Sequence, residues 1–70
     1  MNKTYFLRFA GKHGYQIEER EFAHSEDAWA AFRQLADPHS AEKYTAIELT
    51  EYDLDTDEDT LIAALEFAAN

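Results

Sequence analysis

The chain contains no cysteine, a single proline and only two glycines among its 70 residues. Without cysteine it can form neither a disulfide nor a metal site that depends on thiolates. No apolar run approaches the roughly 18 residues that a membrane-spanning helix needs. The residues ahead of Arg8 are also too few for a signal peptide. We therefore expect a cytoplasmic protein without a membrane association.

Basic residues are scarce as well, and the charge is unevenly distributed. Fifteen acidic and six basic side chains give a formal net charge of −9. The first 36 residues hold five acids and five bases, whereas the remaining 34 hold ten acids and only Lys43 as a base. This balance excludes a nucleic-acid binder that works through a basic patch. Because 46% of the residues are hydrophobic, we still expect a folded chain, with one domain spanning residues 1–70.

Alternating apolar side chains predict three strands. Residues 4–10 alternate with a period of two, and residues 44–52 do the same with a polar outer face. After a segment bounded by two glycines, Tyr15 and Ile17 restart the alternation, which predicts a hairpin. Its second strand should end or bulge near Phe22, because this side chain is out of phase with Ile17.

A helix is predicted from Ser25 onward, because apolar side chains recur there at spacings of three and four residues. Ser25 is the expected N-cap, and the two acids after it favour the positive end of the helix dipole. Trp29 and Phe32 belong to the apolar stripe, so we expect them in the core. The residue before Pro38 resists the helical conformation, which ends the helix. Residues 39–43 are expected to form a polar loop.

Residues 60–67 allow two interpretations. In a strand, the four apolar side chains at odd positions from Leu61 share one face, and residues 53–59 form an acidic hairpin loop. In a helix, the acids before Thr60 occupy a favourable first turn, but Phe67 leaves the apolar stripe. The strand is favoured. It gives an α+β fold, a small antiparallel sheet with one helix packed on it, in the order ββαββ; the helix would give ββαβα.

Motifs for catalysis and for metal binding are incomplete. The first acidic positions of a calcium-binding loop are matched by Asp53, Asp55 and Asp57. The loop's glycine is replaced by Glu58, however, and its last ligand, a glutamate, is replaced by Ala64. The three histidines lack metal-binding spacing, and there is no phosphate-binding glycine loop. So short a chain also has little room for a substrate pocket. We therefore expect no enzyme, no cofactor and no dedicated metal site, with weak divalent binding by the same acids as an alternative.

The acidic run between Glu48 and Asp59 holds seven acids and no base. Folded back as a hairpin, it would present about one carboxylate per 3 Å, close to the charge spacing of a single DNA strand. Such a rod would fit the basic groove of a nucleic-acid-binding protein through salt-dependent electrostatics. The three acids between Glu18 and Glu21 would extend the rod if their strand lay beside residues 44–52.

Exposed tyrosines among these carboxylates would supply apolar anchors for an interface, and both Tyr44 and Tyr52 are expected on the polar face of their strand. The predicted partner-binding residues are Glu48, Glu51, Tyr52, Asp53, Asp55, Asp57, Glu58 and Asp59.

In its length, its net charge and the acidic run of residues 48–59, the chain resembles small acidic inhibitor proteins of phages and mobile elements, of the anti-CRISPR and anti-restriction types. The resemblance is one of size and charge. It implies a protein that acts in the cytoplasm of a bacterial host and does not itself bind nucleic acid. Its partner would be a basic nucleic-acid-binding protein, such as a CRISPR effector complex. A different class of function is the alternative: a small adaptor that pairs through a strand edge or an apolar patch.

Overall fold

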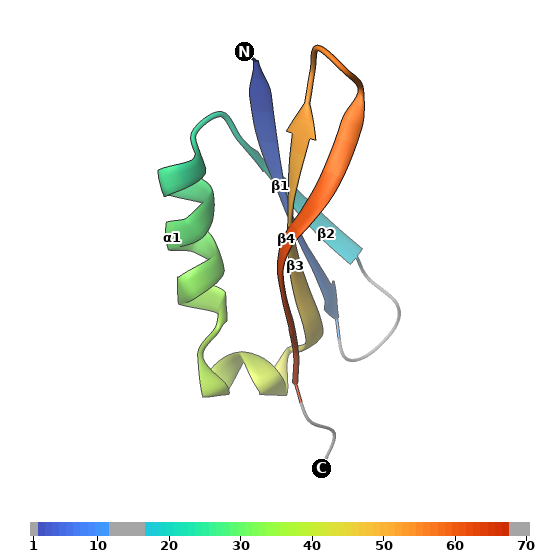
Figure 1. The fold of residues 1–70 in the computed structure, drawn as a ribbon. Helices are drawn as coiled ribbons and strands as arrows, with labels where there is room; N and C mark the ends of the chain where they lie inside the picture. The colour runs from blue at the N-terminus through green and yellow to red at the C-terminus, as the bar shows by residue number, and fades with distance from the viewer. Residues whose placement is uncertain (1, 12–16, 68–70) are drawn as a thin grey trace.

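The computed structural model describes residues 2–11 and 17–67, and it has an α+β fold (Figure 1). Strands β1 (Lys3–Gly11) and β2 (Ile17–Phe22) come first, followed by helix α1 (Ser25–Leu35) and a short 3-10 helix, η1 (Pro38–Glu42). Strands β3 (Tyr44–Asp53) and β4 (Glu58–Glu66) complete the described part. The strands form one antiparallel sheet in the spatial order β2-β1-β3-β4. The predicted order ββαββ is therefore confirmed, and the helical alternative for the last segment is wrong.

Strands β1 and β3 fill the centre of the sheet, and their alternation divides it into two faces. On the face that carries α1, here called the helix face, Leu7 lies opposite Leu49 and Phe9 lies opposite Ile47. These side chains and Ala28 of α1 are buried and form the core. Trp29 and Phe32 pack against this core as half-buried side chains, in line with the predicted stripe. The opposite side of the sheet, here called the open face, has no helix over it in the described part of the chain.

The boundaries of α1 differ slightly from the prediction. Ser25 is the first helical residue, and the N-cap is His24, which makes no side-chain capping hydrogen bond. The helix ends at Leu35, ahead of Pro38, for the predicted reason. The segment expected as a polar loop is η1, where Pro38 occupies the first turn and the Asp37 carboxylate accepts a hydrogen bond from the His39 backbone N–H at 2.8 Å.

The predicted hairpin of β1 and β2 is confirmed. Strand β2 lies beside β1 and not beside β3, so the condition under which its acids would extend the acidic run is not met. One expectation about the sheet is wrong. Tyr44 does not lie on the outer face, because the register shifts between Ala10 and Gly11, and its ring packs edge-on against Phe9 at 5.1 Å in the core. Tyr15, the predicted start of β2, lies outside the described residues; β2 ends at Phe22 without a bulge.

The described residues form an elongated body of 42 × 21 × 15 Å. The turn between β3 and β4 and the N-terminal end of β1 lie together beyond one end of α1, while the last described residue lies toward the other end of the molecule (Figure 1). Within this part of the chain, no helix is both long and apolar enough to cross a membrane.

Candidate functional site

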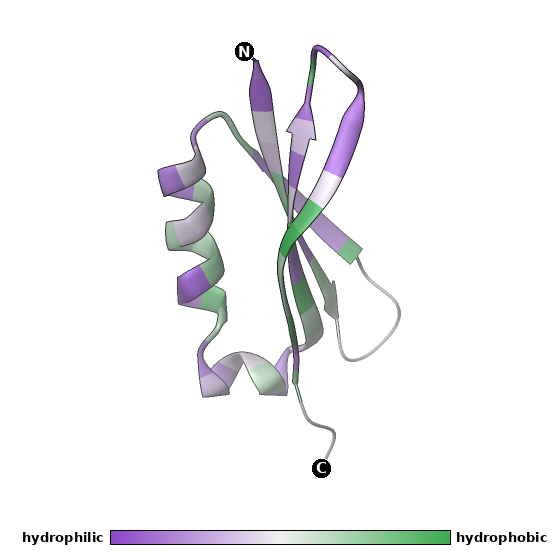
Figure 2. Ribbon diagram, in the orientation of Figure 1, coloured by the Kyte–Doolittle hydropathy of each residue, from purple (hydrophilic) through white to green (hydrophobic). Residues whose placement is uncertain are grey.

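The densest charge lies at the end of the β3–β4 hairpin. The acidic tip, as we call it, consists of Asp53, Asp55, Asp57, Glu58 and Asp59. It projects past the helix, and Figure 2 shows the ribbon there as almost continuously hydrophilic. All of these residues except Asp53 are exposed, and Asp53 is half-buried.

The acidic residues of the tip build the turn that displays them. One carboxylate oxygen of Asp53 accepts hydrogen bonds from the backbone N–H groups of Asp55, at 2.9 Å, and Thr56, at 3.3 Å. The Asp57 N–H donates to the Asp53 carbonyl at 2.8 Å. Asp57 has a positive φ of 60°, a conformation that Asp tolerates better than most residues because of its short polar side chain. Asp53 is therefore a structural residue of the turn as well as a charge.

The tip is also attached to the first strand. The Leu54 N–H donates to the backbone carbonyl of Asn2 at 2.9 Å, and the Asn2 N–H points to the Asp55 carboxylate at 3.4 Å. These contacts join residues more than fifty positions apart in the sequence. They attach the backbone of the turn to the first strand, so the residues that carry the carboxylates have a defined position relative to the sheet.

Among residues 2–11 and 17–67, one base approaches the tip. Lys3 lies opposite Asp53 in the register, but its ammonium group binds Glu51 at 3.1 Å. The hydrogen bond and charge of Glu51 raise the pKa of Lys3, and the charge of Asp53 acts in the same direction. Within the described residues, no ion pair involves Asp55, Asp57, Glu58 or Asp59. These four residues are exposed, and the Asp55 carboxylate accepts the hydrogen bond from the Asn2 N–H described above.

The remaining predicted site residues do not continue the tip as a single rod. Tyr52 lies opposite Asp59 on the open face, whereas Asp53 and Glu58 face each other with side chains toward the helix-face side. Glu51 is bound to Lys3. Farther along the open face, Glu48 lies opposite Arg8. The structure therefore gathers five of the eight predicted residues at one end and distributes the others along β3.

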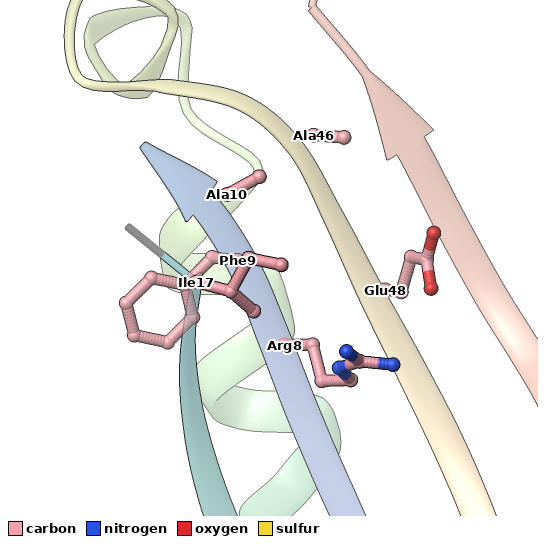
Figure 3. A pocket seen from close by; sticks show the side chains of 6 residues that line it. All are labelled: Arg8, Phe9, Ala10, Ile17, Ala46 and Glu48. Carbon is pink, nitrogen blue, oxygen red and sulfur yellow. The ribbon is translucent and has the colours of Figure 1, made fainter. Parts of the chain in front are cut away.

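The open face carries a mixed surface centred on Arg8. Its guanidinium contacts Glu19 of β2 at 3.5 Å and extends toward β3, which carries Glu48 (Figure 3). Nearby, Phe6 and Tyr52 pack edge to face at 6.2 Å. This contact gives Tyr52 a packing role, but the residue stays half-buried and beside the tip.

Two shallow hollows lie along this face. One of about 140 Å³ is lined by Arg8, Ile17 and their neighbours, and one of about 210 Å³ reaches from Phe6 to Asp59. Both are smaller than the several hundred Å³ typical of small-molecule sites. Nor do any three acidic or histidine side chains of the described residues come together as a metal-binding group. Neither hollow therefore has the volume that is typical of a site enclosing a small molecule.

Sequence reasoning overlooked two features of the site. The attachment of the turn to Asn2 uses mainly backbone groups, which leave no signal in the sequence. The long β4 edge had a signal: residues 60–65 are uncharged within a half of the chain that is otherwise rich in acids.

The chain matches no protein-family model, no curated protein and no solved structure, so the arguments for its function come from this surface alone.

Proposed function

We propose that this protein is a non-enzymatic binding protein whose acidic tip enters a basic nucleic-acid-binding groove of a partner protein and blocks it. An anti-CRISPR protein, acting in a bacterial cytoplasm against a CRISPR effector complex or a similar nuclease, is the concrete form of this proposal. It does not bind nucleic acid itself, because a net charge of −9 repels phosphates.

One observation carries the proposal: four exposed carboxylates without ion pairs among the described residues project from a turn that is fixed by hydrogen bonds to Asn2. A preorganised group of like charges loses little conformational entropy on binding and attracts an oppositely charged surface over the Debye length. Tyr52 and the exposed Leu54 beside it supply apolar surface at the same end.

The test compares two triple variants of equal net charge. Asp55→Asn, Asp57→Asn and Asp59→Asn neutralise the tip and leave the turn residue Asp53 in place. Glu18→Gln, Glu26→Gln and Glu42→Gln remove three exposed charges elsewhere. Each protein is used to capture partners from a bacterial lysate at low and moderate salt, and duplex DNA is then added as a competitor.

We expect the tip variant to lose capture by about tenfold or more, which corresponds to about 1.4 kcal/mol. The control variant should retain capture, and DNA should release the captured proteins. Equal losses in the two variants would show that net charge alone is responsible. Capture that withstands both salt and DNA would also overturn the proposal.

A further inference from the structure

The two edge strands of the sheet, β2 and β4, differ in how well they are protected against pairing with another chain. The β2 edge carries four consecutive charged residues, from Glu18 to Glu21. The β4 edge is uncharged over six consecutive residues, from Thr60 to Leu65. Charges on an edge strand discourage pairing with another chain, and a long apolar edge invites it. Strand β2 therefore carries charges along its edge, whereas the uncharged stretch of β4 is interrupted only by a register shift against β3, where Leu49 pairs with Ala63 and Thr50 with Leu61.

Strand β4 also has less contact with the helix than the other three strands have. Helix α1 packs mainly on β1, β2 and β3. Every side chain of β4 is exposed or half-buried, and Leu61 is 55% exposed. Figure 2 shows the change along the strand, from hydrophilic near the turn to hydrophobic over its middle part, before the strand ends at Glu66. No other strand of the described sheet lies beyond β4, so its outer N–H and C=O groups face outward.

We infer that β4 accepts an extended segment of the partner as an additional strand, and that this segment is uncharged over six residues with a basic residue at each end. The inference rests on the proposed function and adds to it the partner's docking element. Its charge pattern follows from β4 itself, where Asp59 precedes the uncharged stretch and Glu66 follows it. Bases opposite these two acids would form favourable cross-strand pairs.

A second copy of the chain fits this edge poorly. If two β4 strands paired antiparallel with their uncharged stretches fully aligned, Asp59 of each copy would lie directly opposite Glu66 of the other. In-register parallel pairing would place Asp59 beside Asp59 and Glu66 beside Glu66. Either arrangement brings like charges together at both ends of the pair, which destabilises a sheet. Charge complementarity therefore selects a different chain with bases at these positions.

The length of the edge sets the length of the segment. Two bases on either side of six strand residues are seven positions apart, so they must be separated by roughly 23 Å at about 3.3 Å per residue. A segment added to β4 would lie in the same sheet as the acidic tip. The partner's basic groove and its added strand could then contact β4 and the tip at the same time.

The probe for this inference is a capped peptide of lysine, six alternating threonine and valine residues, and lysine. Two control peptides are used: one has glutamate in place of both lysines, and the other is N-methylated at alternate residues, which blocks one hydrogen-bonding edge without changing the charge. Binding is followed by the backbone amide shifts of the ¹⁵N-labelled protein. Leu61→Lys on β4 is compared with Ile17→Lys on β2, an exposed edge residue that receives the same change of charge.

We expect saturable shifts in residues 58–66 with the lysine peptide, and binding weaker by about tenfold or more with either control peptide. Leu61→Lys should weaken binding to a similar extent, and Ile17→Lys much less. Equal binding of the N-methylated peptide, shifts confined to the acidic tip, or equal effects of the two variants would each overturn the inference. A dimer that Leu61→Lys abolishes and Ile17→Lys does not, measured by sedimentation, would show a second copy as the occupant and would also overturn it. If these tests fail while the tip variant still loses capture, the proposed function stands without the added strand.

Discussion

At the scale of single residues, stability depends on very few side chains. Leu7, Ile47 and Leu49 are the largest fully buried side chains, and they meet where β1 and β3 pair under α1. A small domain has a thin margin of stability because it buries a modest share of its surface. Truncating any one of these three side chains is therefore expected to destabilise the whole domain.

Leu49→Ala should lower the free energy of unfolding by about 2–5 kcal/mol, because it removes buried methyl groups and leaves a cavity. Urea unfolding followed by tryptophan fluorescence measures this change through Trp29, the single tryptophan. Leu61→Ala is the matched control, since the Leu61 side chain is largely exposed and its loss should change stability by no more than about 0.5 kcal/mol. Similar losses in the two variants would contradict the assigned core.

The lowered pKa of Asp37 leads to a prediction of how stability depends on pH. Hydrogen bonds from the backbone N–H and the side chain of His39 lower the pKa of the Asp37 carboxyl below its ordinary 3.8. Because the folded-state pKa lies below the unfolded one, the contribution of Asp37 to stability is present above the unfolded pKa and is lost as the pH falls through the folded pKa. A carboxyl-carbon NMR titration should show Asp37 titrating below 3.8. His39→Ala, which keeps the backbone donor, should reverse only part of the shift.

At the scale of elements, the sequence predicted what depends on local periodicity. The alternation in β1 and β3 and the apolar stripe of α1 were sufficient because each follows from the repeat of its own element. The hairpin of β1 and β2 was predicted and is confirmed. Local patterns did not indicate which of these two strands lies next to β3, so the full spatial order was not predictable. The position of Tyr44 depended on a register shift at Gly11, which no pattern of residues indicates.

The candidate site was likewise predictable only where it depends on local sequence and not on how the strands pair. The acids of residues 53–59 and their hairpin were readable from composition and alternation, but the placement of Glu51 against Lys3 required the β1–β3 register. Similarly, the sequence could not separate the two roles of Asp53, whose carboxylate binds two backbone N–H groups within the turn.

The N-terminus of α1 offers a stabilising substitution. His24 is the N-cap with an extended backbone, but its side chain makes no capping hydrogen bond. His24→Ser should raise the free energy of unfolding by about 1 kcal/mol, because serine can accept a hydrogen bond from a free N–H of the first turn. Thermal unfolding measures the gain, and Ala23→Ser, one residue before the N-cap, should give none. A loss of stability in His24→Ser would show that the histidine makes a different contribution.

At the scale of the whole molecule, the clustering of like charges opposes compact folding. Ten of the fifteen acids lie in the last 34 residues, and five of these ten are concentrated at one end of a body 42 Å long. Repulsion among these charges opposes the compact state, and salt screens it. The clustered carboxylates therefore lower the free energy of unfolding, and a solvent-exposed turn could be built without so many charges.

Stability should therefore rise with salt. Between about 20 mM and about 500 mM sodium chloride, where the Debye length falls below the dimensions of the tip, the melting temperature is expected to increase. The triple variant Asp55→Asn, Asp57→Asn and Asp59→Asn should start from a higher melting temperature in low salt and gain less from added salt. The control variant with Glu18, Glu26 and Glu42 changed to Gln should gain more than the tip variant. A melting temperature that falls with salt would show that attractive pairs dominate.

The two hydrogen bonds between Asn2 and the hairpin turn have a practical consequence for work with this protein. Any affinity tag fused ahead of Asn2 would emerge within a few ångströms of Leu54 and Asp55 and would screen them from a partner. A histidine tag placed there would add imidazoles next to the densest group of carboxylates and would occupy the surface that the experiment is meant to probe. Capture and titration experiments should therefore use a tag on the distal side of the molecule, after the last strand, or a cleaved protein.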